Sequence, residues 1–472
     1  MQGLDLLPPV GVAEDTVIGH DGWLFLYQGG QRQFDYLTGA AVPTVEAVTN
    51  FVDNLKRRRA FCAERGIGHL HVVFPSKPLV KTTHLPAAFR DTVSSPYQRY
   101  YAPAVARAAL QDEVLYPLDA LRDLDATTSS FMRLDTHMTH AGSLAAARMI
   151  LARLKGGEIP DDAFVRGQSH FWGDLGMRFG GRDLTAPEEV LRLPDPQPAW
   201  LDNFGTLTGN EGHVVVQIYP EALSRKRLLI FGDSFVMRCL KFLGVVFREV
   251  LFMRSSAIQP DIVRRFAPDM IVTSTAERYL AHVGSDVAPQ DHMLDVYGDL
   301  SYAPAPEVRE GLRAVMSPNL RQRERWIAGL RVKTCASPGC TVPVRGRPAC
   351  ARHDNGVLMP YAADAGCDIR MIRDAPPRAQ PKTDHVPTGA ASDLRQEIVC
   401  IGQRLVALDA EREEVKHELN SLDRGRDTPD SDRRRRIYLE RHLPKLVQER
   451  RALAARRRIL TDYLSGANSK GD

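Results

Sequence analysis

Short apolar runs alternate with amphipathic segments through the first 305 residues of the chain. The apolar runs predict buried strands at 69–74, 213–219, 227–231, 245–252 and 270–274. The segments with helical periodicity predict helices at 45–64, 141–154, 235–243 and 262–266. Continuous apolar strands that alternate with helices are typical of a largely parallel sheet covered on both faces. We therefore predict one α/β domain over residues 1–305.

A different periodicity begins near residue 391. Leucine, isoleucine and valine recur at spacings of four and three up to residue 422 and again from 439 to 464, and a turn rich in polar residues separates the two stretches. This spacing predicts a helical hairpin or coiled coil over 391–466, followed by a disordered tail at 467–472. Such a stem would support self-association or contact with a protein partner.

Residues 306–390 lack long apolar runs, and we expect them to form a linker. Within it, Cys335, Cys340, Cys350 and His353 place four metal-ligating side chains close together in the sequence. This set suits tetrahedral zinc, and the metal would supply folding energy to a segment with almost no core. We predict a structural zinc knuckle at 335–353, and the alternative is a group of unligated cysteines.

Composition and charge exclude several classes of protein. The 472 residues are 43% hydrophobic and 25% charged with a formal net charge of +4, which gives no general argument for binding nucleic acid, and we expect no such partner. No apolar window approaches the length of a membrane span, and the N-terminus lacks the basic and apolar regions of a signal peptide. We expect a cytoplasmic protein without a membrane span; the alternative is a periplasmic one whose natural N-terminus lies upstream.

The main chemical motif follows the predicted strand at 227–231. Gly232-Asp233-Ser234-Phe235 connects that strand to the next predicted helix. A tight turn between strand and helix exposes a serine hydroxyl at the end of the sheet, and the backbone N–H of Ser234 at the helix start is suited to stabilise an oxyanion. Asp233 or Ser234 could instead serve only as a helix cap. The motif alone leaves both readings open.

Asp135 and His137 supply partners for this serine. Residues two apart in an extended segment point to the same side, so the carboxylate can orient the imidazole while the other ring nitrogen faces the serine. We predict that Ser234 is a nucleophile, His137 its base and Asp135 the orienting group. The alternative is an ordinary surface loop that contains a histidine cluster.

Six short motifs occur in a fixed order over about 260 residues. They are Gly19-His20-Asp21-Gly22-Trp23-Leu24-Phe25, Val73-Phe74-Pro75-Ser76-Lys77 with Leu85-Pro86, Leu134-Asp135-Thr136-His137-Met138-Thr139, Gly173-Asp174-Leu175, Gly232-Asp233-Ser234-Phe235 and Glu277-Arg278. This order resembles the alginate O-acetyltransferase group of the SGNH hydrolase-like superfamily. The resemblance implies a Rossmann-like three-layer α/β/α domain in which Ser234, His137 and Asp135 act as a triad.

The resemblance also implies a reaction. It implies O-acetyl transfer, or acyl-ester hydrolysis, at hydroxyls of a bacterial polysaccharide or glycan precursor by way of an acyl-enzyme, with an acetyl donor, a carbohydrate acceptor and no cofactor for the chemistry. Lys77, Arg238 and His140 are candidate substrate-binding residues. Met138 stands where the family usually has tryptophan, which predicts an altered wall beside His137. The alternative function is a non-catalytic carbohydrate-binding or interaction protein that uses the knuckle and the stem.

Overall fold

The computed structural model describes residues 3–179, 181, 183–193, 198–204, 212–287, 305–330, 332–334, 343–345 and 413. The chain divides into two compact units, Met1–Asp374 and Ala375–Asp472, and the fold given below belongs to the first unit. The predicted zinc ligands Cys335, Cys340, Cys350 and His353 lie outside the described residues. So do the predicted tail and, apart from Glu413, the predicted helical hairpin.

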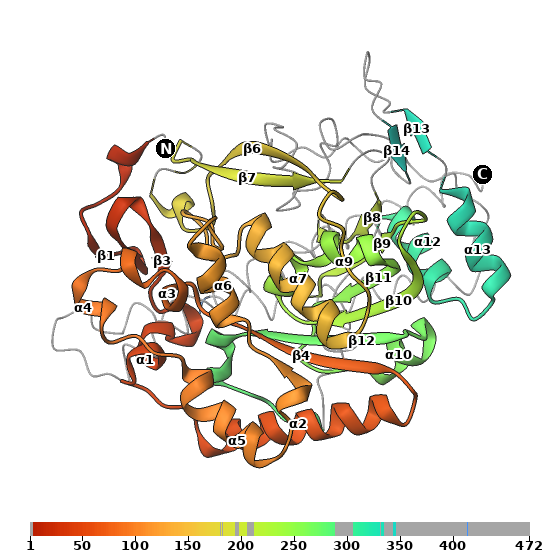
Figure 1. The fold of residues 1–472 in the computed structure, drawn as a ribbon, viewed down its shortest axis with the longest axis horizontal. Coiled ribbons are helices and arrows are strands. Elements are labelled where there is room, and N and C mark those ends of the chain that lie inside the picture. Colours follow the sequence, from red (N-terminus) through yellow and green to blue (C-terminus); the bar gives the residue numbers. More distant parts are fainter. Residues whose placement is uncertain are drawn as a thin grey trace. The chain divides into compact units, whose positions relative to one another are not determined.

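A seven-stranded sheet forms the centre of the first unit (Figure 1). Its strands, in spatial order, are β5 (Val114–Leu115), β4 (Gly68–Phe74), β12 (Met270–Ala276), β10 (Ser224–Phe231), β11 (Phe247–Met253), β9 (Val214–Ile218) and β8 (Ala199–Asp202). The first five strands are parallel to their neighbours, whereas β9 and β8 join at one edge as antiparallel strands. The prediction of an α/β fold with a largely parallel sheet is confirmed.

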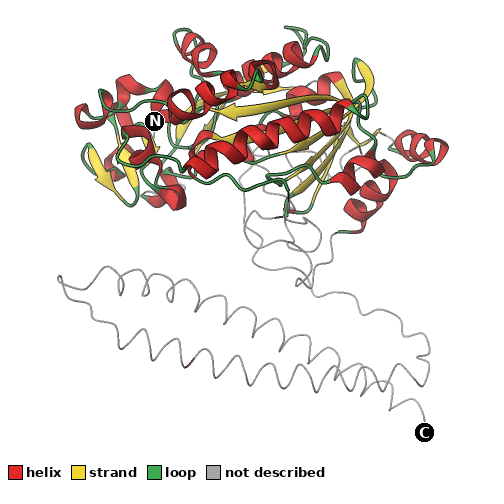
Figure 2. Cartoon of the chain, turned by 90° about the horizontal axis from the view of Figure 1, so that it is seen from below, coloured by secondary structure: helices red, strands yellow, loops and turns green. Residues whose placement is uncertain are grey.

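Alternating side chains of these strands supply two separate regions of core, because successive residues of a strand point to opposite faces. Leu228 and Ile230 of β10 pack on one face with side chains of α7 (His140–Leu154) and α9 (Leu240–Val246). Leu229 and Phe231 pack on the other face with side chains of α10 (Pro260–Phe266). Figure 2 shows helices on both sides of the strands.

The helices lie close to their predicted positions. The segment 45–64 forms α2 (Val45–Ala63), and Thr44 caps its first turn by accepting a hydrogen bond from the Ala47 backbone N–H. The predicted helix at 235–243 is instead divided into α8 (Ser234–Met237) and α9. The division arises because the N–H groups of Arg238 and Cys239 bond to carbonyls three residues earlier, which tightens the chain between the two helices.

Shorter elements surround the sheet. The remaining helices are α1 (Gln33–Thr38), α3 (Lys77–Val80), α4 (Ala87–Arg90), α5 (Ala102–Arg107), α6 (Leu118–Asp125), α12 (Pro306–Val315) and α13 (Leu320–Gly329). The antiparallel strands β1 (Gly11–Ala13), β2 (Thr16–Ile18) and β3 (Leu24–Leu26) form a separate small sheet. Two further pairs are β6 (Val165–Phe171) with β7 (Ala186–Arg192), and β13 (Val332–Thr334) with β14 (Pro343–Arg345).

The packed part of the first unit extends beyond residue 305. Val308 and Val315 of α12 and Ile327 of α13 belong to the same core cluster as Phe231. These two helices fall in the segment that the sequence pattern assigns to the linker, and the exact division into domains stays a prediction.

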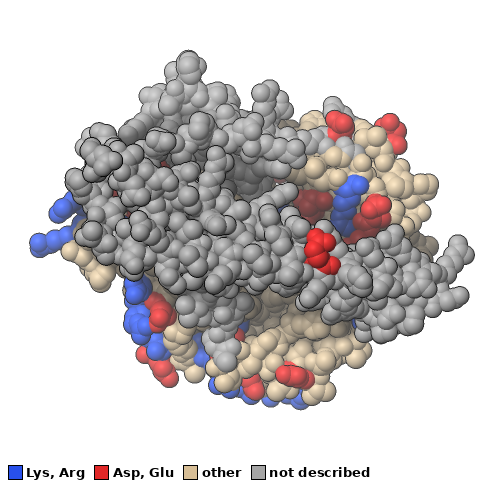
Figure 3. Space-filling view, turned by 180° about the vertical axis from the view of Figure 1, so that it is seen from behind, with Lys and Arg blue, Asp and Glu red and all other residues tan. Residues whose placement is uncertain are grey.

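The surface charge and the length of the helices bear on the sequence predictions for the described residues. On the face drawn in Figure 3, the acidic and basic side chains of the described residues are interspersed. None of the described helices is both long enough and apolar enough to cross a bilayer.

Candidate active site

Three parallel strands bring the candidate residues to one edge of the sheet. Phe231 at the end of β10 is level with Thr273 of β12, and Phe74 at the end of β4 is level with Ala276 of β12. The segments that follow these strands therefore emerge at the same edge, where α/β sheets place their sites. Ser234 lies in the segment that follows β10.

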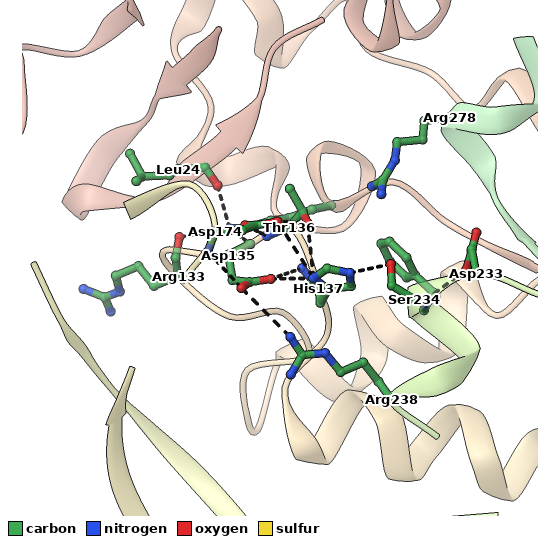
Figure 4. Close-up of polar contacts among 12 residues, drawn as sticks. Leu24, Arg133, Asp135, Thr136, His137, Asp174, Asp233, Ser234, Arg238 and Arg278 are labelled. Carbon is green, nitrogen blue, oxygen red and sulfur yellow. Dashed lines mark hydrogen bonds and ion pairs between the residues drawn. The ribbon is translucent and has the colours of Figure 1, made fainter. Parts of the chain in front are cut away.

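Ser234, His137 and Asp135 form one chain of hydrogen bonds (Figure 4). His137 Nε2 lies 2.7 Å from Ser234 Oγ, and His137 Nδ1 lies 2.7 Å from Asp135 Oδ1. Since the Asp135 carboxylate can only accept, Nδ1 carries the proton and Nε2 is left to accept from the serine hydroxyl. The structure thus places the three predicted triad residues in the geometry that proton transfer from Ser234 requires.

The Asp135 carboxylate is buried but has several donors around it. The backbone N–H of His137 donates to its Oδ1 at 2.8 Å, and the backbone N–H of Asp174 donates to its Oδ2 at 3.0 Å. Arg238 approaches the same Oδ2 within 4.0 Å. Burial opposes ionisation, but the charge and hydrogen bonds of His137 and the charge of Arg238 hold the pKa of Asp135 well below its usual range. The carboxylate is therefore ionised and able to orient the imidazole.

The segment Gly173-Asp174-Leu175 supports the loop of residues 133–137, called the D-x-H loop below. The N–H groups of Leu175 and Gly176 both donate to Leu134 O, at 3.1 and 3.0 Å. Gly173 has a positive φ of 60°, and a Cβ at this position would lie 2.2 Å from Leu134 O. Only glycine allows this close approach to the loop.

Asp174 contacts the D-x-H loop through its side chain as well. Its carboxylate accepts from the backbone N–H of Thr136 at 2.8 Å and from the Thr136 hydroxyl at 2.6 Å. The backbone N–H of Asp174 also donates to Asp135 Oδ2. These three hydrogen bonds hold Asp135 and Thr136 in place. Asp174 is thus a second carboxylate beside the candidate triad, with Oδ2 4.0 Å from His137 Nδ1.

Asp135, His137 and Asp174 also meet the geometric condition for a metal site. Each offers one potential ligand atom, and these atoms lie within 4.8 Å of one another. Both ring nitrogens of His137, however, are already engaged by Asp135 and Ser234. The arrangement therefore fits a chain of proton donors and acceptors better than a metal centre.

The nucleophile turn is fixed by Asp233 rather than by Ser234. The Asp233 carboxylate accepts from Phe235 N at 2.9 Å, which caps α8, and from Ala276 N at 2.5 Å, which connects the turn to β12. Gly232 packs tightly, because a Cβ there would lie 2.1 Å from Ser274 Oγ. Since Asp233 provides the cap, the Ser234 hydroxyl remains available to His137.

The other candidate residues lie in different surroundings. Lys77 is 4% exposed, and its ammonium group donates to three backbone carbonyls, at distances of 2.6 to 2.9 Å. This placement favours a structural role over substrate contact. Arg238 is also buried and faces Asp135, whereas His140 accepts from Leu191 N at 2.7 Å and contacts Lys241. His140 thus contacts β7 and α9.

Met138 does not form a wall of the site. Its side chain is 1% exposed and belongs to the core cluster that contains Phe131 and Phe235. The expectation that it alters the surface beside His137 is wrong, because Met138 points into the core beneath the loop.

A small opening lies next to the candidate triad. Its lining includes Thr136, Phe235, Ser76, Gln33 and Arg278. Thr136 and Phe235 are the sequence neighbours of His137 and Ser234, so the opening lies beside the candidate triad, and Lys77 also contributes to its lining. In the sequence, Arg278 stands out only as half of the Glu277-Arg278 pair, and no motif there predicts that it lies at the site.

Arg278 lines this opening and donates to the Tyr279 hydroxyl at 3.4 Å. Its guanidinium lies 5.3 Å from the centre of the Phe235 ring, and Figure 4 shows it on the opposite side of the Ser234–His137 pair from Arg238. Its neighbour Glu277 is fully engaged instead: the carboxylate accepts from the backbone N–H groups of Ser76 and Tyr97 and from two hydroxyls. Glu277 therefore connects the segments after β4 and β12 and leaves Arg278 at the surface of the opening.

Comparison with known proteins finds one family model that matches part of the chain. Residues 16–197 match the family model described as SGNH hydrolase-like domain, acetyltransferase AlgX. The matched segment contains Asp135, His137, Gly173 and Asp174 and ends before Ser234. The search of curated proteins found no match to the chain.

Several solved structures are similar to the chain at low sequence identity. PatB1 of Bacillus cereus with a sulfonyl adduct is 12% identical, with 56% of this chain and 97% of that chain covered and a TM-score of 0.42. The O-acetyltransferase domain of Pseudomonas putida AlgJ is 19% identical, with coverage of 58% and 94% and a TM-score of 0.36. Pseudomonas aeruginosa AlgX is 17% identical, with coverage of 59% and 68% and a TM-score of 0.36. On the family match, residues 16–197 are an AlgX-like SGNH hydrolase-like acetyltransferase segment, and the match covers less than half of the chain.

Proposed function

We propose that this enzyme transfers an acetyl group to a carbohydrate hydroxyl through an acetyl-enzyme formed on Ser234. The observation that carries the proposal is the continuous chain of hydrogen bonds from Asp135 through His137 to Ser234 at the carboxyl end of β10. A serine, a neutral imidazole and a buried carboxylate in this order form an activated nucleophile.

The first half-reaction forms the acetyl-enzyme. Ser234 Oγ attacks the carbonyl carbon of the acetyl donor while His137 Nε2 accepts the hydroxyl proton. The ionised Asp135 stabilises the imidazolium that results, and the backbone N–H of Ser234 is the proposed donor to the oxyanion. Collapse of the tetrahedral intermediate breaks the bond to the leaving group, which takes the proton from His137.

The second half-reaction repeats these steps with the acceptor. A sugar hydroxyl gives its proton to His137 and attacks the acetyl carbon, and Ser234 recovers the proton when it leaves. Water in place of the sugar would give ester hydrolysis. The opening beside Thr136 and Phe235 is where we place the acceptor, with Arg278 as a donor to its oxygen atoms.

The test uses the full chain with a chromogenic acetyl ester and, separately, with soluble oligosaccharides as acceptors. Ser234→Ala should lower the rate of acetyl release by about a thousandfold or more, because the nucleophile is lost. The exposed Ser285→Ala is the matched control and should leave the rate unchanged. A wild-type peptide acetylated on Ser234 in mass spectrometry supports the intermediate, whereas equal rates for wild type and Ser234→Ala refute the proposal.

A further inference from the structure

The D-x-H loop has little regular structure of its own, yet it must hold two catalytic groups in place. In the described structure only an isolated bridge between Phe131 and Met138 flanks it. The backbone carbonyls of such a buried segment need donors from elsewhere in the fold. Lys77 supplies them for two residues of this loop.

The ammonium group of Lys77 joins three parts of the fold. It donates to Arg133 O and to Asp135 O, both at 2.9 Å, and to Leu24 O of β3 at 2.6 Å. Figure 4 shows Leu24 and Arg133 beside Asp135. Lys77 itself begins α3, directly after the segment that leaves β4. One side chain thus fixes the D-x-H loop relative to both the central sheet and the small N-terminal sheet.

Few other groups suit this position. Three carbonyl oxygens around one nitrogen match the three N–H donors of an ammonium group, whereas the planar fork of arginine presents its donors differently. Two aromatic rings also lie near the nitrogen, since the centres of the Trp23 and Phe25 rings are 5.0 and 5.2 Å from it. A side chain without donors would remove one hydrogen bond from each of the three carbonyls, and of these Arg133 O would keep the bond from Leu24 N at 3.1 Å.

We propose that Lys77 is a positioning residue of the acyl-transfer site, whose ammonium group holds residues 133–135 so that Asp135 and His137 face Ser234. The inference deepens the proposed function and rests on it for its effect on rate. Its structural part, the fixing of the loop, stands independently of which reaction the site performs.

Charged groups around Lys77 make the interaction sensitive to pH. Burial lowers the pKa of Lys77 to about 7, while Asp135, Asp174 and Glu188 favour the charged form and Lys81 opposes it. The backbone carbonyl of Arg133 also lies next to Lys77, because it accepts a hydrogen bond from the ammonium group. The neutral amine keeps only two N–H groups, so one of the three carbonyls loses its donor when Lys77 deprotonates.

Glu188 contacts the loop from another element. It lies on β7, accepts from Arg133 N at 3.1 Å, and burial raises its pKa to about 7. Above this pH its negative charge favours the protonated form of Lys77. Removing that charge should therefore make Lys77 lose its proton at lower pH, and removing the positive charge of Lys81 should have the opposite effect.

The first arm of the test measures the loop directly. In hydrogen exchange of the full chain, Lys77→Met should raise exchange in the peptide of residues 131–138, with unchanged exchange in distant core peptides. The exposed Lys56→Met, on α2, is the matched control and should change neither. Equal exchange of this peptide in wild type and Lys77→Met overturns the proposal, whether or not the protein releases acetate.

The second arm measures the pH profile of Ser234-dependent acetyl release. Lys77→Met should lower kcat about tenfold or more with little change in KM, and it should abolish the basic limb of the profile. Lys77→Arg should not restore the rate.

Two other variants decide the outcome if Lys77→Met is unstable. Glu188→Gln should move the basic limb to lower pH, and Lys81→Met should move it to higher pH. A basic limb that stays in place in both variants overturns the role of Lys77. Absence of Ser234-dependent turnover in the wild type would instead refute the proposed function, and the exchange arm would still decide the role of Lys77.

Discussion

Replacing Gly173 with alanine should move the D-x-H loop and reduce activity. The new Cβ would lie 2.2 Å from Leu134 O and 2.4 Å from Leu134 C, both backbone atoms that no side-chain rotation can displace. An ordinary contact requires a separation of about 3.4 Å, so the two segments must separate by about 1 Å. The positive φ of 60° adds about 1–2 kcal/mol of strain for a residue with a Cβ.

The displacement acts directly on the candidate triad. It breaks or lengthens the bonds from Leu175 N and Gly176 N to Leu134 O, and the bond from Asp174 N to Asp135 Oδ2. A shift of about 1 Å in a catalytic group can lower a rate by about a hundredfold. We therefore expect Gly173→Ala to lower kcat for acetyl release by about that factor, with the larger effect on kcat rather than KM.

The variant Gly66→Ala separates the effect of the steric contact from the effect of the positive φ. Gly66 has nearly the same φ, 63°, but no atom lies within 4 Å of the position that its Cβ would take. This control should lose about 1–2 kcal/mol of stability in thermal or denaturant unfolding and retain wild-type kcat. If Gly173→Ala keeps kcat within twofold of wild type, or if Gly66→Ala loses activity to the same extent, the argument from the loop is refuted.

Three other predictions concern separate features. Gly232→Ala should lower kcat about tenfold or more, because its Cβ would lie 2.1 Å from Ser274 Oγ. The double variant with Ser274→Ala should recover part of the lost kcat. If it recovers none, the contact with Ser274 is not the cause. Asp135→Asn should lower kcat by about 10³ to 10⁴, because the imidazole loses the group that fixes its tautomer. Since the pKa of Asp135 is lowered in the folded protein, its stabilising effect is present above the unfolded value of about 3.9 and is lost as the pH falls further. The stability gap between wild type and Asp135→Asn in thermal unfolding should therefore close in acid, and a constant gap would contradict this. Metal analysis of protein purified without chelators should find about one zinc per chain from the segment 335–353, and a value below about half would argue against the predicted knuckle.

The sequence predicted the parts of this fold that depend on local pattern. Apolar runs such as 227–231 predicted the strands, and helical periodicity predicted α2 and α7. These predictions succeed because the alternation of buried and exposed positions depends only on residues close together in the sequence. The proximity of Ser234 to His137 was also predicted, from a spacing of two residues in one motif and a strand–turn–helix in another. Their catalytic role stays a prediction that the rate measurements decide.

Other features could not be predicted because they depend on contacts between distant segments. A lysine is usually exposed, so nothing in the sequence marks Lys77 as buried among carbonyls more than 50 residues away. The break between α8 and α9 depends on the hydrogen bonds that the N–H groups of Arg238 and Cys239 make to carbonyls three residues earlier, and the apolar pattern of 235–243 does not mark it. Met138 appeared to be a surface substitution because its neighbour His137 faces the site, but in this loop the two residues point in different directions.

The hydrogen bonds of the D-x-H loop explain why several sequence motifs occur together. The loop leaves carbonyls of residues 133–135 to be satisfied in a buried place, and two motifs supply the donors: Lys77 donates to Arg133 O and Asp135 O, while the segment after Gly173 donates to Leu134 O. A third motif contributes Leu24, whose carbonyl accepts a hydrogen bond from Lys77 and whose N–H donates to Arg133 O. Four of the six motifs therefore share these hydrogen bonds, and the nucleophile turn contacts the same loop through the bond between Ser234 and His137. It follows that Asp135, His137 and Ser234 alone are an insufficient basis for inferring this activity in a sequence. Without a donor at position 77 and a glycine at position 173, the loop that carries Asp135 and His137 would lose the contacts that orient these two residues toward Ser234.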